Sequence, residues 1–295
     1  MASELKVVEL IAQPVLMAKA ALGEGAIWDS QKGVLNWIDI DGFTVNTFDP
    51  QSRKNTVIKL PTHVGTVVKR KQGGFLVGMG REFAHVDEAG KISVLAQLDE
   101  PETNRLNDGK CDPAGRFWCG SMAFDFKPGA GKLYMMDLDH SVQVKVDAVT
   151  ISNGIVWTAD ASTMYYIDTK SGHIDAFDYD IATGAITNRR IAVKNSWDGY
   201  FDGMTIDTED NVYVAMWEGS CVLKINPKTA ELLAKINVPG ALNITSCAFG
   251  GADLRDLYIT SAIASADAAK YPNSGDLFKI TVPDAQGLPA FEYGG

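Results

Sequence analysis

The chain contains 295 residues, and its 46% hydrophobic content is ample for the core of one large domain or two smaller ones. It carries 27 basic and 37 acidic side chains, and the formal net charge of −10 disfavours nucleic acid and anionic membranes as partners. The N-terminal residues show no basic stretch leading into an apolar core, and no apolar run reaches the ~18 residues of a membrane span. We therefore expect a cytoplasmic protein.

Six similar segments recur along the chain. Each combines a short apolar run, a polar turn and a second run of strand formers, as in residues 23–39 (GEGAIWDSQKGVLNWID). Successive copies begin 40 to 49 residues apart, which leaves room in each unit for two further strands. In chain order the copies begin at Glu24, Val64, Asn107, Asn153, Asp202 and Ser246.

This repeat predicts an all-β fold, a six-bladed β-propeller. Apolar residues at helical spacing are largely missing, and short runs of Val, Ile, Tyr, Phe and Trp lie between Gly, Pro, Asn and Asp turns. Six four-stranded sheets around a channel explain the period, whereas a two-sheet sandwich would not require a repeat. We expect residues 1–295 to form a single propeller domain, with residues 5–11 pairing with the last blade to close the ring.

The first strand of each blade lines the channel in such a fold, so the residues that open the copies should meet at one rim. Glu24, Asn107, Asn153 and Asp202 are then neighbours. Two carboxylates and an amide carbonyl, from Glu24, Asn153 and Asp202, suit a divalent cation such as Ca²⁺, Mg²⁺ or Mn²⁺, and Zn²⁺ can use them too. Without a cation, the buried carboxylates would repel each other. Each residue taken alone has another interpretation, because Asn-Gly and Asp-Gly are common turn dipeptides.

Other kinds of site are disfavoured. The chain has only 4 histidines and no His-Glu-x-x-His motif, and no Gly-x-Ser-x-Gly elbow occurs. Residues 128–132 (PGAGK) are similar to a phosphate-binding loop, but Phe126 and Leu133 replace the glycine and the Ser or Thr that such a loop requires. The 4 cysteines have neither zinc-site spacing nor the density of a disulfide scaffold, so we expect them to be buried apolar residues.

Five motifs, in order and spacing, resemble the SMP-30/gluconolactonase (regucalcin-like) family of sugar lactonases. The resemblance spans nearly the whole chain and implies a six-bladed propeller. The motifs are GEG at residues 23–25, NRLNDGK at 104–110 running into DPAGR at 112–116, SNG at 152–154, FDG at 201–203, and TSCAFGG at 245–251 with LYITS at 257–261.

The resemblance also implies roles for individual residues. Glu24, Asn153 and Asp202 match the residues that bind a single divalent cation in the family. Arg105 and Asn107 match residues that face the substrate, and a metal contact of Asn107, direct or through water, stays open. Asp125 occupies the place where relatives carry an acidic substrate contact.

A lactone is a cyclic ester, so its hydrolysis needs an activated water and stabilisation of the carbonyl oxygen. Following the proposal usual for the family, we assign the general base to Asp202, with pure metal ligation as the alternative. Arg105 would position the lactone through paired hydrogen bonds, and its alternative is a surface salt bridge. Asp108 would orient Asn107 or Lys110.

The sequence therefore predicts an enzyme of carbohydrate metabolism. Its reaction would be the metal-dependent opening of aldonolactones, such as glucono-, xylono- or arabinolactone, to the aldonic acid, with a small sugar lactone as partner and no nucleic acid or membrane. One alternative is a propeller esterase or phosphotriesterase, or a luciferin-regenerating type of hydrolase, because such proteins share the metal ring. Another is a calcium-binding regulatory protein, which would need the cation ligands but not Arg105.

Overall fold

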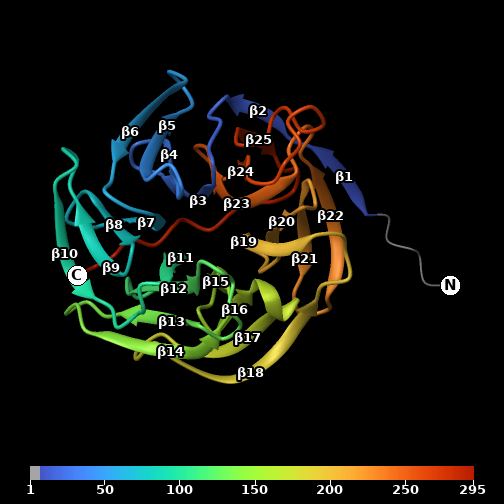
Figure 1. Cartoon of the computed structure of the whole chain (residues 1–295). Coiled ribbons are helices and arrows are strands. Elements are labelled where there is room, and N and C mark those ends of the chain that lie inside the picture. The colour runs from blue at the N-terminus through green and yellow to red at the C-terminus, as the bar shows by residue number, and fades with distance from the viewer. Residues whose placement is uncertain (1–6) are drawn as a thin grey trace.

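The structure is a computed structural model that describes residues 7–295. It is a six-bladed β-propeller built almost entirely of strands, and the blades surround a central channel (Figure 1). Each blade is a meander whose innermost strand lines the channel. The fold class predicted from the six-fold repeat is confirmed.

The first three blades are regular four-stranded antiparallel sheets. From the channel outward, blade 1 contains β3 (Gly23–Asp29), β4 (Val34–Asp39), β5 (Thr44–Asp49) and β6 (Lys54–Lys59). Blade 2 contains β7 (Val64–Lys69), β8 (Phe75–Met79), β9 (Glu82–Val86) and β10 (Ile92–Gln97). Blade 3 contains β11 (Asn104–Cys111), β12 (Phe117–Ala123), β13 (Gly131–Met136) and β14 (Val142–Val149).

The last three blades include the N-terminal strands. Blade 4 contains β15 (Ser152–Trp157), β16 (Thr163–Asp168), β17 (His173–Asp180) and β18 (Ala185–Lys194), with the 3-10 turn η1 (Thr169–Ser171) after β16. Blade 5 contains β19 (Tyr200–Ile206), β20 (Val212–Trp217), β21 (Cys221–Asn226), β22 (Glu231–Asn237) and, outermost, β1 (Val8–Ile11). Blade 6 contains β23 (Asn243–Gly250), β24 (Asp256–Ala262), β25 (Leu277–Thr281) and, outermost, β2 (Gln13–Leu16).

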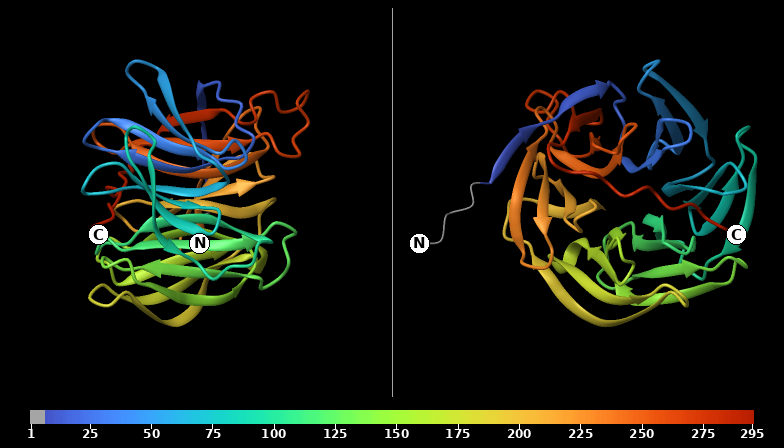
Figure 2. Two further views of the ribbon diagram at one scale, coloured as in Figure 1. Left: turned by 60° about the vertical axis from the view of Figure 1, so that its left-hand side comes forward. Right: turned by 180° about the vertical axis from the view of Figure 1, so that it is seen from behind.

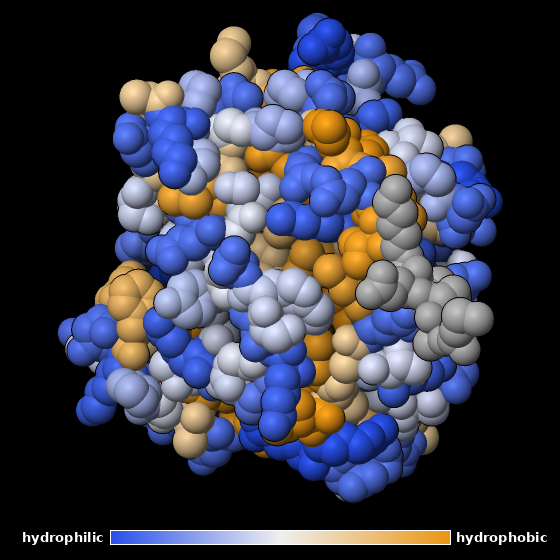
Figure 3. Space-filling view, turned by 90° about the vertical axis from the view of Figure 1, so that its right-hand side faces the viewer, coloured by the Kyte–Doolittle hydropathy of each residue, from blue (hydrophilic) through white to orange (hydrophobic). Residues whose placement is uncertain are grey.

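The N-terminal strands close the ring differently from the prediction. The strand β2 pairs antiparallel with β25 and completes blade 6, whereas β1 pairs parallel with β22 on blade 5. The predicted pairing of residues 5–11 with the last blade is therefore wrong for Val8–Ile11, and residues 5 and 6 lie outside the described part. Both blades offer a free outer edge, and β1 takes the one on blade 5. Polar and apolar side chains are interspersed on this side of the molecule (Figure 3).

The last residues cross the end of the channel opposite the predicted site. We call residues 286–295 the C-terminal strap; it runs across the ring from blade 6 towards blades 2 and 3 (Figures 1 and 2). The backbone N–H of Thr208 donates to Gln286 O at 2.8 Å, and that of Tyr293 donates to Lys69 O at 2.8 Å. Backbone hydrogen bonds of this kind fix the strap to several blades at once.

The described residues include no helix long and apolar enough to cross a membrane. All four cysteines are buried and free, as the sequence predicted.

Candidate functional site at the channel mouth

All six innermost strands have a register irregularity near their first residues. In β3 it falls between Glu24 and Ile27, and corresponding shifts occur in β7, β11, β15, β19 and β23. A bulge of this kind bends the strand and changes the direction of its side chains. The irregularity therefore recurs at the level of the ring where the predicted site residues lie.

Glycines follow the three predicted ligands, and after Asn153 and Asp202 they allow neighbouring inner strands to approach closely. A Cβ on Gly154, after Asn153, would lie 2.9 Å from the carbonyl oxygen of Asp202. A Cβ on Gly203, after Asp202, would lie 2.7 Å from Thr245 O. The Asn-Gly and Asp-Gly pairs thus lie within strands, and the alternative interpretation as hairpin turns does not hold.

A cavity of about 600 Å³ opens at this end of the channel. Its lining includes five of the seven predicted site residues, namely Glu24, Arg105, Asn107, Asn153 and Asp202. The residues come from the starts of four innermost strands, β3, β11, β15 and β19. The structure therefore brings together side chains that are far apart in the sequence, such as Glu24 and Asp202, which are separated by 178 positions.

Two of the acidic residues that line the cavity, Glu24 and Asp202, are buried. Glu24 is 6% exposed and Asp202 is 5% exposed. Burial raises the pKa of Glu24 well above its ordinary range, and the nearby carboxylates of Asp202 and Asp108 raise it further. Burial also raises the pKa of Asp202, polar contacts with Asn153 offset part of that rise, and the Asp108 carboxylate adds to it. A cation in this cavity, in addition to the positive charge of Arg105, would favour the ionised form of both carboxyl groups.

Two oxygens of the predicted ligands have no hydrogen-bond donor. Within the described part of the chain, Oδ1 of Asn153 and Oδ1 of Asp202 are buried without a partner. The Asn153 amide is held from its other side, since its Nδ2 donates to Thr169 Oγ1 at 3.1 Å. Buried polar atoms are rarely left unpaired, and an unpaired one calls for an explanation. A cation held by these oxygens would supply that explanation.

The donor set fits a hard divalent cation. Glu24, Asn153 and Asp202 offer only oxygen, which suits Ca²⁺, Mg²⁺ or Mn²⁺ and is accepted by Zn²⁺. Among residues 7–295 no group of three or more His, Cys, Asp or Glu side chains could hold a metal ion. The third ligand here is an amide, so the site would be two carboxylates and one carbonyl oxygen.

Arg105 and Asn107 form one unit beside the carboxylates. Arg105 is buried, and its Nη1 donates to Asn107 Oδ1 at 2.6 Å and to Leu106 O at 3.0 Å. The Nδ2 of Asn107 donates to Ser152 O at 2.7 Å. The amide of Asn107 thus holds the guanidinium with its oxygen and the backbone of β15 with its nitrogen. The described residues give Arg105 no ion pair within 4.0 Å, so the surface salt bridge considered from the sequence is not found.

Asp108 makes neither of the two hydrogen bonds that were predicted for it. Its Oδ1 accepts from Gly109 N at 2.7 Å, and its Oδ2 is buried without a partner. Lys110 donates instead to Met204 O at 2.6 Å, and Asn107 bonds to Arg105. Asp108 therefore does not orient Asn107 or Lys110 through a hydrogen bond. It acts on the site through its charge, which raises the pKa of Glu24 and Asp202.

Asp125 does not line the cavity. It is exposed, and its carboxylate accepts from Lys127 N at 3.1 Å. Its neighbours Phe124 and Phe126 line the cavity instead. Loop paths of this kind are not encoded in a repeat, so the position matched in the sequence did not give the direction of the side chain.

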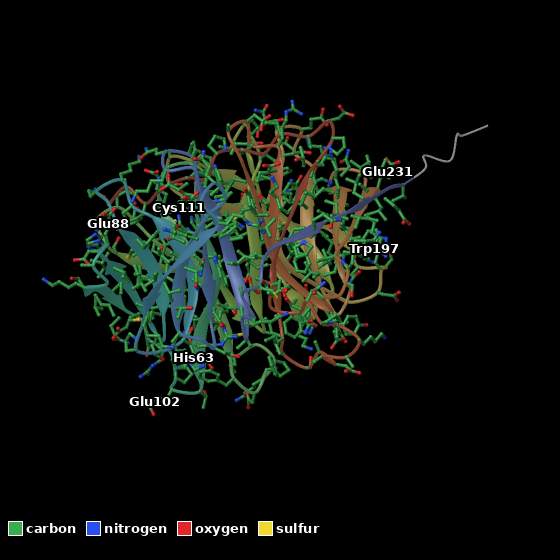
Figure 4. All side chains as sticks on the ribbon, turned by 90° about the horizontal axis from the view of Figure 1, so that it is seen from above. His63, Glu88, Glu102, Cys111, Trp197 and Glu231 are labelled. Carbon is green, nitrogen blue, oxygen red and sulfur yellow. The ribbon has the colours of Figure 1, made fainter. Side chains whose placement is uncertain are left out.

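Sequence reasoning missed several lining residues on connecting loops. Asp41 lies between β4 and β5, Thr169 and Lys170 lie in η1, and Trp217 ends β20. These segments follow the second strand of their blades. In a propeller meander, those connections return to the face where the innermost strands begin, and this rule could have found them. Figure 4 shows the ring edge-on, with His63 near this face and Cys111, at the end of β11, towards the other.

The fold and the site together define a class: a six-bladed propeller with an acidic, oxygen-rich site at one channel mouth. A family model described as "SMP-30/Gluconolactonase/LRE-like region" matches residues 22–263. The chain belongs to this family, which confirms the resemblance inferred from its motifs.

Similar proteins cover nearly the whole chain. Regucalcin from Danio rerio is 41% identical over 288 residues, 95% of this chain and 97% of that protein. Human regucalcin is 35% identical over 292 residues, again 95% and 97%. A calcium-binding regucalcin from Agrobacterium tumefaciens superposes with a TM-score of 0.92 at 25% identity, covering 98% of this chain and 99% of that one. A luciferin-regenerating enzyme superposes with a TM-score of 0.89 at 32% identity, covering 94% and 97%.

Proposed function

We propose that this protein is a divalent-metal-dependent lactonase that opens aldonolactones, such as glucono-, xylono- or arabinolactone, to the aldonic acid. The observation that carries the proposal is the pair of unpartnered buried oxygens, on Asn153 and Asp202, beside a buried guanidinium in one cavity. Membership of the gluconolactonase family supports the same reaction.

Glu24, Asn153 and Asp202 would hold the cation, which when bound would polarise a carbonyl and lower the pKa of a bound water. Side chains of the protein would orient the substrate and accept the proton. The Arg105 guanidinium, fixed by Asn107, would donate hydrogen bonds to lactone oxygens and orient the ring. The Asp202 carboxylate would accept the proton of the attacking water as general base.

Hydrolysis of D-glucono-δ-lactone, followed by acid release in a pH-stat, tests the proposal. The full chain should be active with CaCl₂ or ZnCl₂ and inactive after chelation. Asp202→Asn should lower kcat/KM by about 10²–10⁴-fold, since that is the usual contribution of a general base. Asp253→Asn, on an exposed side chain far from the cavity, is the matched control. An active chelated protein, or an Asp202→Asn variant close to wild type, would contradict the proposal.

Two other functions have a specific observation in their favour. The similarity to a luciferin-regenerating enzyme favours a hydrolase that uses the same metal ligands on a different ester. Hydrolysis of an aryl ester or a phosphotriester in the same assay would reveal it. The similarity to a calcium-binding regucalcin favours a regulator that only binds the cation. Arg105→Ala distinguishes a lactonase from a protein that only binds the cation. We expect it to abolish lactone hydrolysis and to leave cation affinity, measured by calorimetry, within about threefold of wild type.

A further inference from the structure

We infer that the site takes lactones that carry an aromatic substituent, with the aromatic group lying against Phe124 and Phe126 at the cavity mouth. This inference rests on the proposed lactonase function and names its substrate class more closely. It comes from the size of the cavity and from the distribution of polar and apolar side chains in its wall.

The cavity is larger than a plain sugar lactone requires. Such a lactone has about twelve non-hydrogen atoms, which occupy less than ~360 Å³ even at the volume that liquid water gives each molecule. The cavity holds about 600 Å³, a size suited to a ligand that also carries a ring or chain. A single sugar ring would leave much of this space to water.

The cavity lining combines polar groups at the starts of the innermost strands, charged loop side chains (Asp41, Lys170 and Glu218) and the two phenyl rings of the loop after β12. Phe124 is 47% exposed and Phe126 is 55% exposed, and both line the cavity. They follow β12 on one loop. Asp125, between them, lies outside the lining. The loop therefore presents two phenyl rings to a ligand and keeps its only carboxylate away from it.

Two further aromatic rings, which do not line the cavity, pack in series behind Phe124. The ring of Phe124 packs edge to face on His63 with centroids 5.1 Å apart, and His63 packs edge to face on Phe43 at 4.6 Å. Burial lowers the pKa of His63 and the positive charge of Arg105 lowers it further, while Asp41, whose Oδ1 lies 3.7 Å from His63 Nε2, offsets part of the shift. Edge-to-face and offset contacts with the rings of Phe124 and Phe126 favour an aromatic ligand group over a hydroxyl group, which would lose its water here.

The backbone at Phe126 adds a further point. Its φ of 59° is in the left-handed region, where a bulky side chain is unfavourable and Gly or Asn is usual. The phenyl ring is more than half exposed, so its packing within the free protein does not compensate for that strain. Contact with a bound aromatic group would give the ring the burial that it otherwise lacks.

A matched pair of substrates tests the inference on the metal-loaded full chain. γ-Phenyl-γ-butyrolactone and γ-(hydroxymethyl)-γ-butyrolactone share the reacting ring and differ only in the substituent. We expect kcat/KM to favour the phenyl compound by about tenfold or more, mainly through KM. Phe124→Ser and Phe126→Asn should each lower kcat/KM for the phenyl compound several times more than for the hydroxymethyl compound, so that most of the preference is lost.

Phe126→Asn also controls for folding, because Asn tolerates the left-handed backbone and should leave Tm equal or higher. Ile191→Ser removes an exposed apolar side chain on the outer strand β18 and should leave kcat/KM unchanged for both substrates. Equal rates for the two compounds in the wild type, or a preference that survives both Phe substitutions, would overturn the inference and leave the lactonase proposal standing. If neither compound nor D-glucono-δ-lactone is hydrolysed, the lactonase proposal itself fails.

Discussion

Glu24 shares a buried space with two other carboxylates, and this determines how metal-free protein responds to pH. Because its pKa is raised in the folded state, the folded protein holds this proton more tightly than the unfolded chain does. The contribution to stability is fully present below the ordinary value of 4.5 and is lost as the pH rises through the raised value. Asp202 acts in the same direction.

Glu24→Gln should therefore stabilise the metal-free protein at pH 8 and make little difference at pH 4. In chelator at pH 8 we expect Tm to rise by at least ~2 °C, the shift that about 1 kcal/mol gives in a large domain. With saturating CaCl₂ the order should reverse, since the variant lacks a ligand and a ligand bound only by the folded state stabilises it. Thermal unfolding followed by circular dichroism measures all three values. A variant less stable than wild type in chelator at pH 8 would count against a repulsive carboxylate pair.

Residues at repeat positions could be assigned from the sequence, and residues defined by side-chain direction could not. Glu24, Asn153 and Asp202 open three copies of the repeat, so pseudo-symmetry alone brings them to one cavity. The use of the Asn107 oxygen by Arg105, and the outward position of Asp125, depend on rotamers and on a loop path. Neither leaves a periodic signal in the chain.

At the scale of elements, the inner strands form the site because their backbones touch. A Cβ on Gly65 in β7 would lie 2.4 Å from Leu106 O and 2.7 Å from Asn107 N in β11. The repeat predicted the six inner strands. Their bulges could not be predicted, because a register shift depends on the partner strand as well as on the strand itself.

Gly65→Ala should both destabilise the fold and lower activity. The methyl group must push β11 away, which costs about 1–3 kcal/mol as overpacking and displaces Arg105 and Asn107. We expect kcat/KM on D-glucono-δ-lactone to fall by about tenfold or more. Gly33→Ala is the control, since its methyl group meets nothing within 4 Å and its φ of 67° affects only stability. Equal kcat/KM in the two variants would show that the contact between β7 and β11 does not position the site.

At the scale of the whole molecule, one short strand closes the ring. The sequence indicated that an N-terminal segment does this, but β1 and β2 are both short and similar in character. Only tertiary pairing shows that Gln13–Leu16 completes blade 6 and that Val8–Ile11 extends blade 5. In addition, Val8 and Ile11 remain more than half exposed, so β1 contributes little burial.

Two N-terminal deletions distinguish these roles. Removal of residues 1–11 takes away β1 and should lower Tm by only a few degrees, because it removes few buried side chains. Removal of residues 1–17 also takes away β2 and exposes the edge of β25, so we expect a much larger loss of Tm together with aggregation in size-exclusion chromatography. Similar Tm values for the two deletions would mean that β2 is not needed for closure.

The C-terminal strap crosses one end of the propeller channel, so the site is approached from the other end. Residues Leu288 and Phe291 of the strap cover the end of the channel bounded by Trp28 and Trp157, whereas the reactive groups lie at the opposite end. In the proposed reaction, the lactone would enter and the aldonic acid would leave through the same cavity mouth, so bound product would block the next substrate. With a single entrance, turnover would depend on the rate of product release as well as on the rate of bond cleavage.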